Sequence, residues 1–327
     1  MKQAYFVENR EQDWNKLHSV LDAYESKRSK ARDIEVDGFI RLYRDIARDL
    51  AIARSRNYSN ALVNRLNDLT VRGHNAVYQN RSGWVAKCVE FVTRNFPEEV
   101  RRNWRLLLIA TCAFLVPAAG IASLIVVDNQ YVQSVLSPYQ IAEVEEMYDP
   151  DGFVQSENRP VRSRLGAFGY YIYNNASIGL RCAATGIFFG IGTVAVLVIN
   201  GVILSTIFTH LVLVGYSETL FSFVAGHSAL ELTAIAISGT AGLRLGQAML
   251  APGSVARSTA IRRARKTAVI LVFGAMIMFF FAAFIEAFWS TMRLPPTLKY
   301  GVGIGFWILV VSYFVLAGRN AVRQGSN

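Results

Sequence analysis

The sequence predicts an all-α protein: a polytopic membrane helical bundle of about six spans that follows an N-terminal cytoplasmic helical domain. Two observations predict this class. Of the 327 residues, 52% are hydrophobic, and after Trp104 the apolar residues gather in runs long enough to cross a bilayer. The residues before them are instead strongly charged. We therefore place the cytoplasmic helical domain at 1–100 and the transmembrane domain at 101–327, with an extracytoplasmic loop at 128–176.

The uneven distribution of charge predicts the topology. Residues 1–105 hold 20 Lys and Arg against 14 Asp and Glu, and residues 244–266 hold six basic residues and no acid. Residues 128–176 hold three Arg against seven Asp and Glu. Because basic segments beside spans stay in the cytoplasm, we expect a multi-pass protein of the bacterial inner membrane with both termini inside. The net charge of +10 then reflects topology, and we expect no binding of nucleic acid.

The N-terminal domain is predicted to be a small antiparallel helical bundle. Three segments carry apolar residues at helical spacing, around Trp14, Ile46 and Leu66. Each segment can bury one face against the others. A fourth apolar stripe, from Trp84 to Val92, fits a helix on the membrane surface or a core helix equally well. The polar start of the chain predicts no secretory signal, so we expect this domain in the cytoplasm.

The transmembrane domain is predicted to cross the bilayer six times. Between the acidic loop and the basic segment near Arg257, the chain must cross an odd number of times. Three tight crossings satisfy this condition, and so does one crossing combined with re-entrant helices. The six predicted spans are 106–127, 177–198, 202–222, 227–249, 267–288 and 301–316.

Small residues mark places where helices can approach closely. Gly186 with Gly190 and Gly242 with Gly246 have GxxxG spacing, and Gly239 lies on a nearby face. Such spacing favours helix packing, because lipid offers no hydrophobic drive for association. The packing is either within one chain or at the seam of a homodimer. We expect a homodimer, with membrane lipid around it.

His227 and Glu231 are the most informative polar residues of the predicted spans. They lie four residues apart, so a helix places them on one face. A carboxylate facing hydrocarbon costs at least about 2.5 kcal/mol, so Glu231 should face protein or water. The pair is therefore a candidate functional site, and a structural hydrogen bond between helices is the alternative.

Further polar residues extend this candidate intramembrane site. Asn200-Gly201 suits a helix break or a turn between spans. Glu286 is not one of these candidates, because it lies close to Trp289 at the end of a span, which predicts a solvated, interfacial position. The remaining candidates are Asn174, Asn175 and Arg244.

No motif of enzyme chemistry occurs. The sequence has no hydrolase elbow, Walker loop, HExxH motif or zinc-binding cysteine set, and its four histidines are dispersed. The cysteines, Cys88, Cys112 and Cys182, have no paired spacing. We expect a non-enzymatic protein with no catalytic residue, no metal and no cofactor.

The membrane motifs together resemble one family. These motifs are Asn174-Asn175, the series Gly186, Gly190 and Gly192, Asn200-Gly201, and the stretch from Gly226-His227 through Glu231 to Gly246. They resemble the stage II sporulation protein M family. The N-terminal stretch Leu42-Tyr43-Arg44, with Leu66-Asn67, resembles the cytoplasmic extension of longer bacterial members. The resemblance implies a membrane architecture without catalytic residues, and MoxR-type ATPases and RDD membrane proteins as partners.

The sequence leaves two functions open. We favour a non-enzymatic envelope scaffold or assembly partner that couples the cytoplasmic helical domain to the external loop. The alternative is a proton- or ion-responsive transporter or channel that uses His227 and Glu231. A hydrated path from Glu231 to either face would favour transport, whereas a dry, fully paired Glu231 would favour the scaffold.

Overall fold

The computed structural model describes residues 3–26, 36–150 and 161–319, and these residues form helices and no strand. The predicted all-α class is confirmed. The chain divides into two units after Glu90, earlier than the expected boundary at residue 100. The reason is that the segment after Glu90 packs with the membrane helices, as the stacked rings of Phe91 and Phe96 and the contact of Phe91 with Phe273 show.

The N-terminal unit contains three helices in its described part, α1 (Gln3–Ser26), α2 (Val36–Ser55) and α3 (Asn60–Glu90). Their apolar faces enclose a core of their own, as the sequence pattern predicts. The fourth stripe does not form a separate helix: α3 runs through it, and Trp84 is 68% exposed. The buried core residues are Phe6, Trp14, Leu17, Leu21, Ile46, Leu50, Ala53, Leu62, Leu66 and Leu69.

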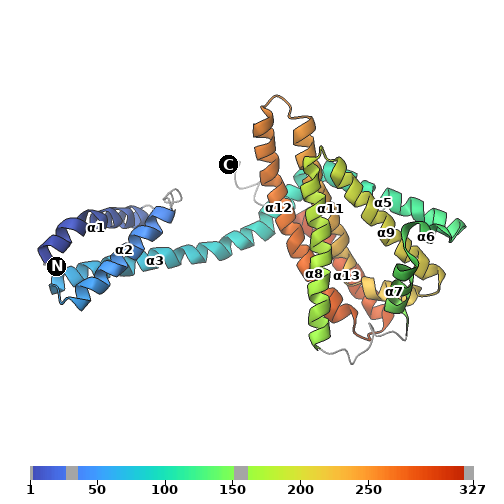
Figure 1. Ribbon diagram of the computed structural model, residues 1–327, viewed down its shortest axis with the longest axis horizontal. Coiled ribbons are helices and arrows are strands. Elements are labelled where there is room, and N and C mark those ends of the chain that lie inside the picture. Colours follow the sequence, from blue (N-terminus) through green and yellow to red (C-terminus); the bar gives the residue numbers. More distant parts are fainter. Residues whose placement is uncertain (1–2, 27–35, 151–160, 320–327) are drawn as a thin grey trace. The chain divides into compact units, whose positions relative to one another are not determined.

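The membrane unit consists of the remaining helices, drawn in Figure 1. In chain order they are η2 (Phe91–Asn95), α4 (Phe96–Arg102), α5 (Trp104–Val127), α6 (Tyr131–Val135), α7 (Pro138–Tyr148), α8 (Val161–Ala184), η4 (Thr185–Ile187), α9 (Ile191–Leu213), α10 (Ser217–Val224), α11 (Ser228–Leu250), α12 (Arg257–Phe284), η5 (Ile285–Ser290) and α13 (Pro296–Leu316).

Four of the described helices are long and apolar enough to cross a membrane: α5, α9, α12 continued by η5, and α13. The pair α10 and α11, bent by 69° at its break, makes a fifth if it counts as one span. The count of six stays a prediction, in which α8 would be the sixth crossing. The predicted acidic loop, 128–176, contains α6, α7 and the first 16 of the 24 residues of α8, so it overlaps most of the helix that would be the sixth crossing. Its residues 151–160 lie outside the described part.

Two of the predicted spans, 177–198 and 202–222, are wrong. Helix α8 ends at Ala184, and the chain reverses through Phe189 and Gly190, whose φ angles are +54° and +81°. Helix α9 then runs without interruption from Ile191 to Leu213. A left-handed backbone is open to glycine at little steric cost, so Gly190 permits the reversal. The sequence analysis read this glycine only as a packing residue.

The predicted break at Asn200-Gly201 is also wrong, because both residues lie inside α9. Asn200 Nδ2 donates to the carbonyl of Val196 at 2.7 Å, so the amide is satisfied within its own helix. A Cβ at Gly201 would overlap the carbonyl oxygen of Phe114. Gly201 therefore allows α5 and α9 to approach each other closely.

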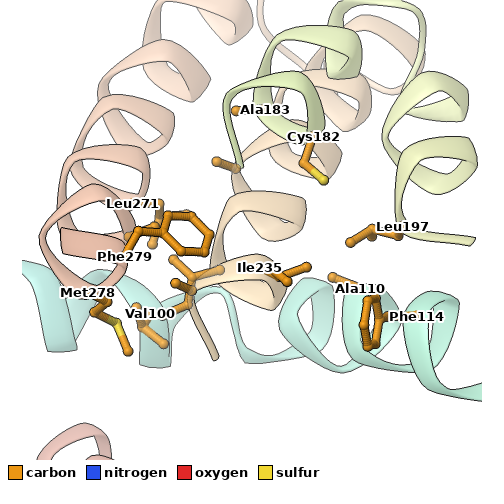
Figure 2. Close-up of a cluster of buried hydrophobic side chains, with 14 of the residues drawn as sticks. Val100, Ala110, Phe114, Cys182, Ala183, Leu197, Ile235, Leu271, Met278 and Phe279 are labelled. Carbon is orange, nitrogen blue, oxygen red and sulfur yellow. The ribbon is translucent and has the colours of Figure 1, made fainter. Parts of the chain in front are cut away.

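Helix α11 lies in the middle of the membrane unit and packs against α5, α8, α9, α12 and α13. Figure 1 shows α8 and α12 beside it. In Figure 2, side chains of α12, including Phe279, lie on one side of Ile235, and those of α5 and α9, including Leu197, lie on the other. Every residue from Ala234 to Gly242 is buried, as expected for a helix with neighbours all round.

The membrane unit has two chemically different ends. At one end, Arg101 Nη1 donates to the carbonyl of Phe314 at 2.8 Å and joins α4 to the end of α13. We call the other end the loop end; it comprises α6, α7, the end of α9, α10, the start of α11, and η5. There His210 Nε2 of α9 lies 2.7 Å from Glu145 Oε1 of α7, which fastens α7 to the bundle.

Candidate functional site

A histidine and two carboxylates come together at the loop end. His227 lies at the bend between α10 and α11, Glu231 lies in the first turn of α11, and Glu286 lies in η5. One nitrogen or oxygen from each residue lies within 4.8 Å of the others. The His227 side chain is 5% exposed and that of Glu231 is 23% exposed. We call these three residues the acid–histidine cluster.

The imidazole of His227 is oriented by η5. Its Nδ1 forms a hydrogen bond with Ser290 Oγ at 3.1 Å, while its Nε2 lies 3.7 Å from Glu231 Oε2. The second distance is too long for a hydrogen bond. Lys299 Nζ donates to the carbonyl of Ser290 at 2.9 Å and so holds Ser290 in place. Nε2 is therefore the ring nitrogen that faces the acids.

Glu286 contributes an oxygen with unmet hydrogen-bonding capacity. Its Oε2 is buried and accepts no hydrogen bond from any described residue. A buried polar atom without a partner is uncommon and destabilising. Residue 286 lies in a π-helical turn, and such wide turns are frequent at functional sites. Glu286 and Ser290, four residues apart in this turn, both take part in the site.

Aromatic side chains cover the cluster from α7 and α10. The ring of Tyr148 meets Phe223 edge to face at a centroid distance of 5.7 Å, and Phe223 meets the ring of His227 at 5.6 Å. Burial and the negative charge of Glu286, with smaller effects of Tyr171 and Glu231, raise the pKa of Tyr148. The Tyr148 hydroxyl therefore keeps its proton.

The other predicted polar residues lie elsewhere. Asn174 Nδ2 donates to Asn175 Oδ1 at 3.1 Å within α8. Asn175 is 3% exposed, one turn after Tyr171, and its Nδ2 has no partner among the described residues. Asn200 lies in mid-α9 and is satisfied there. Arg244 lies 13 residues after Glu231, about 20 Å along α11, where its Nη1 donates to Gln247 Oε1 at 2.7 Å.

The predicted packing glycines form one seam inside the chain. A Cβ at Gly186 would overlap the backbone of Gly242, and a Cβ at Gly246 would overlap the backbone of Gly190. A Cβ at Gly239 would lie 2.8 Å from a side-chain carbon of Leu197 in α9 and 3.1 Å from the Cβ of Ala110 in α5. The two GxxxG motifs therefore pack against each other, so neither motif is free to form the seam of a homodimer.

Sequence reasoning found His227 and Glu231 but misplaced Glu286. Glu286 was expected at a solvated interface, and Tyr148 and Ser290 were not singled out. The sequence does show that Glu286 is an acid at the end of an apolar segment, and this feature alone could have indicated a role in the site. Its position in the cluster depends on the packing of η5 against the start of α11, which no local pattern reveals.

Two family models match the chain. The model described as "Stage II sporulation protein M" matches residues 103–291, and the model described as "Domain of unknown function (DUF8413)" matches residues 4–79. The first match covers more than half of the chain and includes the whole acid–histidine cluster; the second lies within the N-terminal unit. No curated protein and no solved structure matches the chain. The chain thus belongs to the stage II sporulation protein M family, and it is a multi-pass membrane protein with an additional N-terminal helical unit.

Proposed function

We propose that the protein is a non-enzymatic scaffold or assembly partner of the bacterial cell envelope, which holds partner proteins at the inner membrane. The observation that carries this proposal is the N-terminal unit, which has its own hydrophobic core and its own family match. A helical unit that packs without help from the membrane helices can present a surface to another protein. The membrane unit then serves as its anchor and carries α7 on the loop end.

We propose that both termini lie in the cytoplasm. The supporting observation is that basic residues of α4 lie at the same end of the membrane unit as the end of α13 and the basic start of α12. Arg101, at the entrance to α5, donates to the carbonyl of Phe314 near the end of α13. Arg102 lies 3.4 Å from the hydroxyl of Thr267, at the end of the basic stretch that begins α12. Basic segments favour the cytoplasmic side. The predicted tail residue Arg323 lies outside the described residues.

The partners proposed are those that the family resemblance implies: a MoxR-type ATPase and an RDD membrane protein. The N-terminal unit offers them a cavity of about 460 Å³ between α1 and α2, whose lining includes Tyr5, Arg48 and Ile52. We also propose a homodimer. Its interface must use surfaces other than the Gly186–Gly242 seam, which is closed within one chain.

Cross-linking in the native host tests the scaffold. A photoreactive amino acid replaces Tyr5 or Arg48 in the full-length chain, because both side chains are more than half exposed. We expect adducts with the MoxR-type ATPase or the RDD protein. The matched control places the same group at Tyr139 of α7, which is 76% exposed and lies on the loop end. If neither Tyr5 nor Arg48 yields an adduct with these proteins, the scaffold proposal fails.

A second candidate is an ion-responsive transporter or channel, and the acid–histidine cluster favours it. Ionisable residues inside a membrane often mark ion pathways. The Glu231 side chain is 23% exposed, and its Oε2 is 3.7 Å from His227 Nε2, too far for a hydrogen bond. Ion flux into sealed proteoliposomes distinguishes the candidates. Ion flux with the wild type that is lost with a folded Glu231→Gln variant would support transport. Ion flux no faster than that into protein-free liposomes would support the scaffold.

A further inference from the structure

We propose that His227, Glu231 and Glu286 bind one divalent transition-metal ion of the Zn²⁺ class at the loop end. This site is separate from the proposed docking of a partner on the N-terminal unit, and neither proposal depends on the other. It also departs from the sequence analysis, which found no metal-binding motif because the three ligands come from two distant segments.

The spacing of the three side chains fits one ion. Ligands about 2.0–2.1 Å from a tetrahedral Zn²⁺ lie roughly 3.3–3.4 Å from each other. His227 Nε2 and Glu231 Oε2 are 3.7 Å apart. One ligand atom from each of His227, Glu231 and Glu286 lies within 4.8 Å of the other two. Rotation of the two carboxylates about their terminal bonds closes the remaining gap, since that torsion is soft in glutamate.

The surroundings of His227 match those of a metal-bound histidine. A metal-binding imidazole usually donates its second N–H to a neighbouring oxygen, which fixes the ring. With the proton on Nδ1, His227 donates to Ser290 Oγ at 3.1 Å and directs the lone pair of Nε2 toward Glu231. Ser290 is held in turn by Lys299, whose Nζ donates to its carbonyl at 2.9 Å. The ring is therefore preoriented for a ligand on its Nε2 side.

The negative charge of the two carboxylates favours binding of a cation. Two partly buried carboxylates close to each other destabilise the protein unless something compensates their charge. The buried Oε2 of Glu286 accepts no hydrogen bond from a described residue, so it is available as a ligand. A divalent ion would neutralise both carboxylates and coordinate this oxygen. Protons are the alternative compensation, and the experiment below distinguishes the two.

The donor types determine which ion is preferred. Ca²⁺ and Mg²⁺ prefer oxygen ligands throughout, whereas an imidazole nitrogen combined with carboxylate oxygens suits Zn²⁺, Mn²⁺ or Fe²⁺. Three protein ligands leave one tetrahedral position open. Glu231 is 23% exposed, which gives the ion a way in. The ring of Phe223, 5.6 Å from that of His227 between centroids, packs against the site.

The chain contains a matched control for this proposal. His210 and Glu145 also pair a buried imidazole with a carboxylate at the loop end, 2.7 Å apart. No third histidine, cysteine or acid joins them among the described residues. Two ligands hold a metal ion far less tightly than three, so His210→Gln should leave metal binding unchanged.

Metal titration of the purified full-length protein tests the site. The protein is freed of any affinity tag, treated with chelator in detergent, and titrated with Zn²⁺, Mn²⁺, Ca²⁺ and Mg²⁺. Bound metal is counted by mass spectrometry, and the melting temperature is recorded in parallel. We expect one Zn²⁺ per chain, a higher melting temperature with Zn²⁺, and no comparable effect of Ca²⁺ or Mg²⁺.

Variants assign the ion to the three residues. Glu231→Gln and Glu286→Gln each remove the charge of one ligand without adding bulk, and each should weaken Zn²⁺ binding by more than about 100-fold. Ser290→Ala removes only the hydrogen-bond partner of His227 and should weaken binding by roughly 10-fold. His210→Gln should bind as the wild type does. Melting of the metal-free variants verifies that they are folded. The proposal is overturned if the wild type binds no Zn²⁺, if it prefers Ca²⁺, or if Glu286→Gln binds Zn²⁺ as tightly as the wild type.

Discussion

The two halves of α11 differ in what their side chains do. Its first turn, entered through His227 and containing Glu231, carries ionisable groups whose hydrogen bonding is incomplete. Its later turns carry Gly239, Gly242 and Gly246, which lie in direct contact with neighbouring helices. One half therefore contributes a polar site, and the other contributes close packing.

This difference teaches that stability and function can be separated along one helix. Close packing of helices stabilises a membrane bundle, because lipid supplies no hydrophobic drive. A buried polar cluster without full compensation destabilises it, and such clusters persist where they serve a function. Substitutions in the glycine half should therefore reduce stability. Substitutions in the polar half should change ligand binding and leave stability equal or higher.

The largest effect is expected for Gly242→Leu. A side chain at this position meets the carbonyl of Cys182 and the hydroxyl of Thr193, and neither backbone nor hydrogen-bonded hydroxyl can move aside easily. We expect a loss of about 3 kcal/mol or more in the free energy of unfolding, at the upper end of overpacking effects. The yield of folded protein in detergent and its melting temperature measure this loss.

The control for this variant is Gly305→Leu in α13, where a Cβ meets nothing within 4 Å. It should melt close to the wild type. Equal melting temperatures for Gly242→Leu and the wild type would show that the glycine half of α11 does not depend on close contact.

A smaller effect is expected for Gly190→Ala. The nearest atoms to a Cβ here, in Leu243 and Gly246, lie 3.6 and 3.7 Å away, which is ordinary contact. The remaining cost is the left-handed backbone, with φ at +81°, which disfavours alanine by about 1–2 kcal/mol. Gly242→Ala should cost more, because there the added methyl group overlaps its neighbours. The melting temperatures of the two variants show whether conformational strain or steric overlap costs more. If Gly190→Ala melts below Gly242→Ala, the close contact proposed at Gly242 is contradicted.

These positions also show what sequence can and cannot predict. The spacing of His227 and Glu231 is local, so one helical turn brings them together and the pattern shows it. Glu286 is 55 residues from Glu231, and its place depends on tertiary packing. Gly190 was read as a packing residue, since composition does not distinguish a left-handed turn from a close contact.

Asn200-Gly201 shows a related limit of sequence reasoning. Asparagine and glycine often end helices in water, which suggested a break. Inside α9 the asparagine side chain is satisfied by the carbonyl of Val196, and the glycine makes room for α5. The two residues therefore continue the helix, and the predicted spans on either side of them were misplaced.

A still smaller effect is expected where α7 meets α9. The contact of His210 with Glu145 is a single pair, and the Glu145 side chain is 40% exposed, so solvent screens it. A double-mutant cycle with His210→Gln and Glu145→Gln should give a coupling energy of about 0.5–1 kcal/mol, with a loss of stability in each single variant. Zero coupling, measured from melting in detergent, would show that this pair does not fasten α7 to the bundle.

The central claim is that the polar half of α11 is a ligand site that lowers the stability of the empty protein. The melting temperatures of wild-type protein and Glu286→Gln, each with and without Zn²⁺, test it most directly. Without metal, Glu286→Gln should melt at or above the wild type, because one of two neighbouring, partly buried carboxylates is gone. With Zn²⁺ at about 100 times the wild type's dissociation constant, the wild type should gain about 2.7 kcal/mol and the variant, with binding more than about 100-fold weaker, less than about 0.4 kcal/mol. A metal-free variant that melts below the wild type, together with no Zn²⁺ effect on either protein, would contradict the account and make the cluster a structural contact.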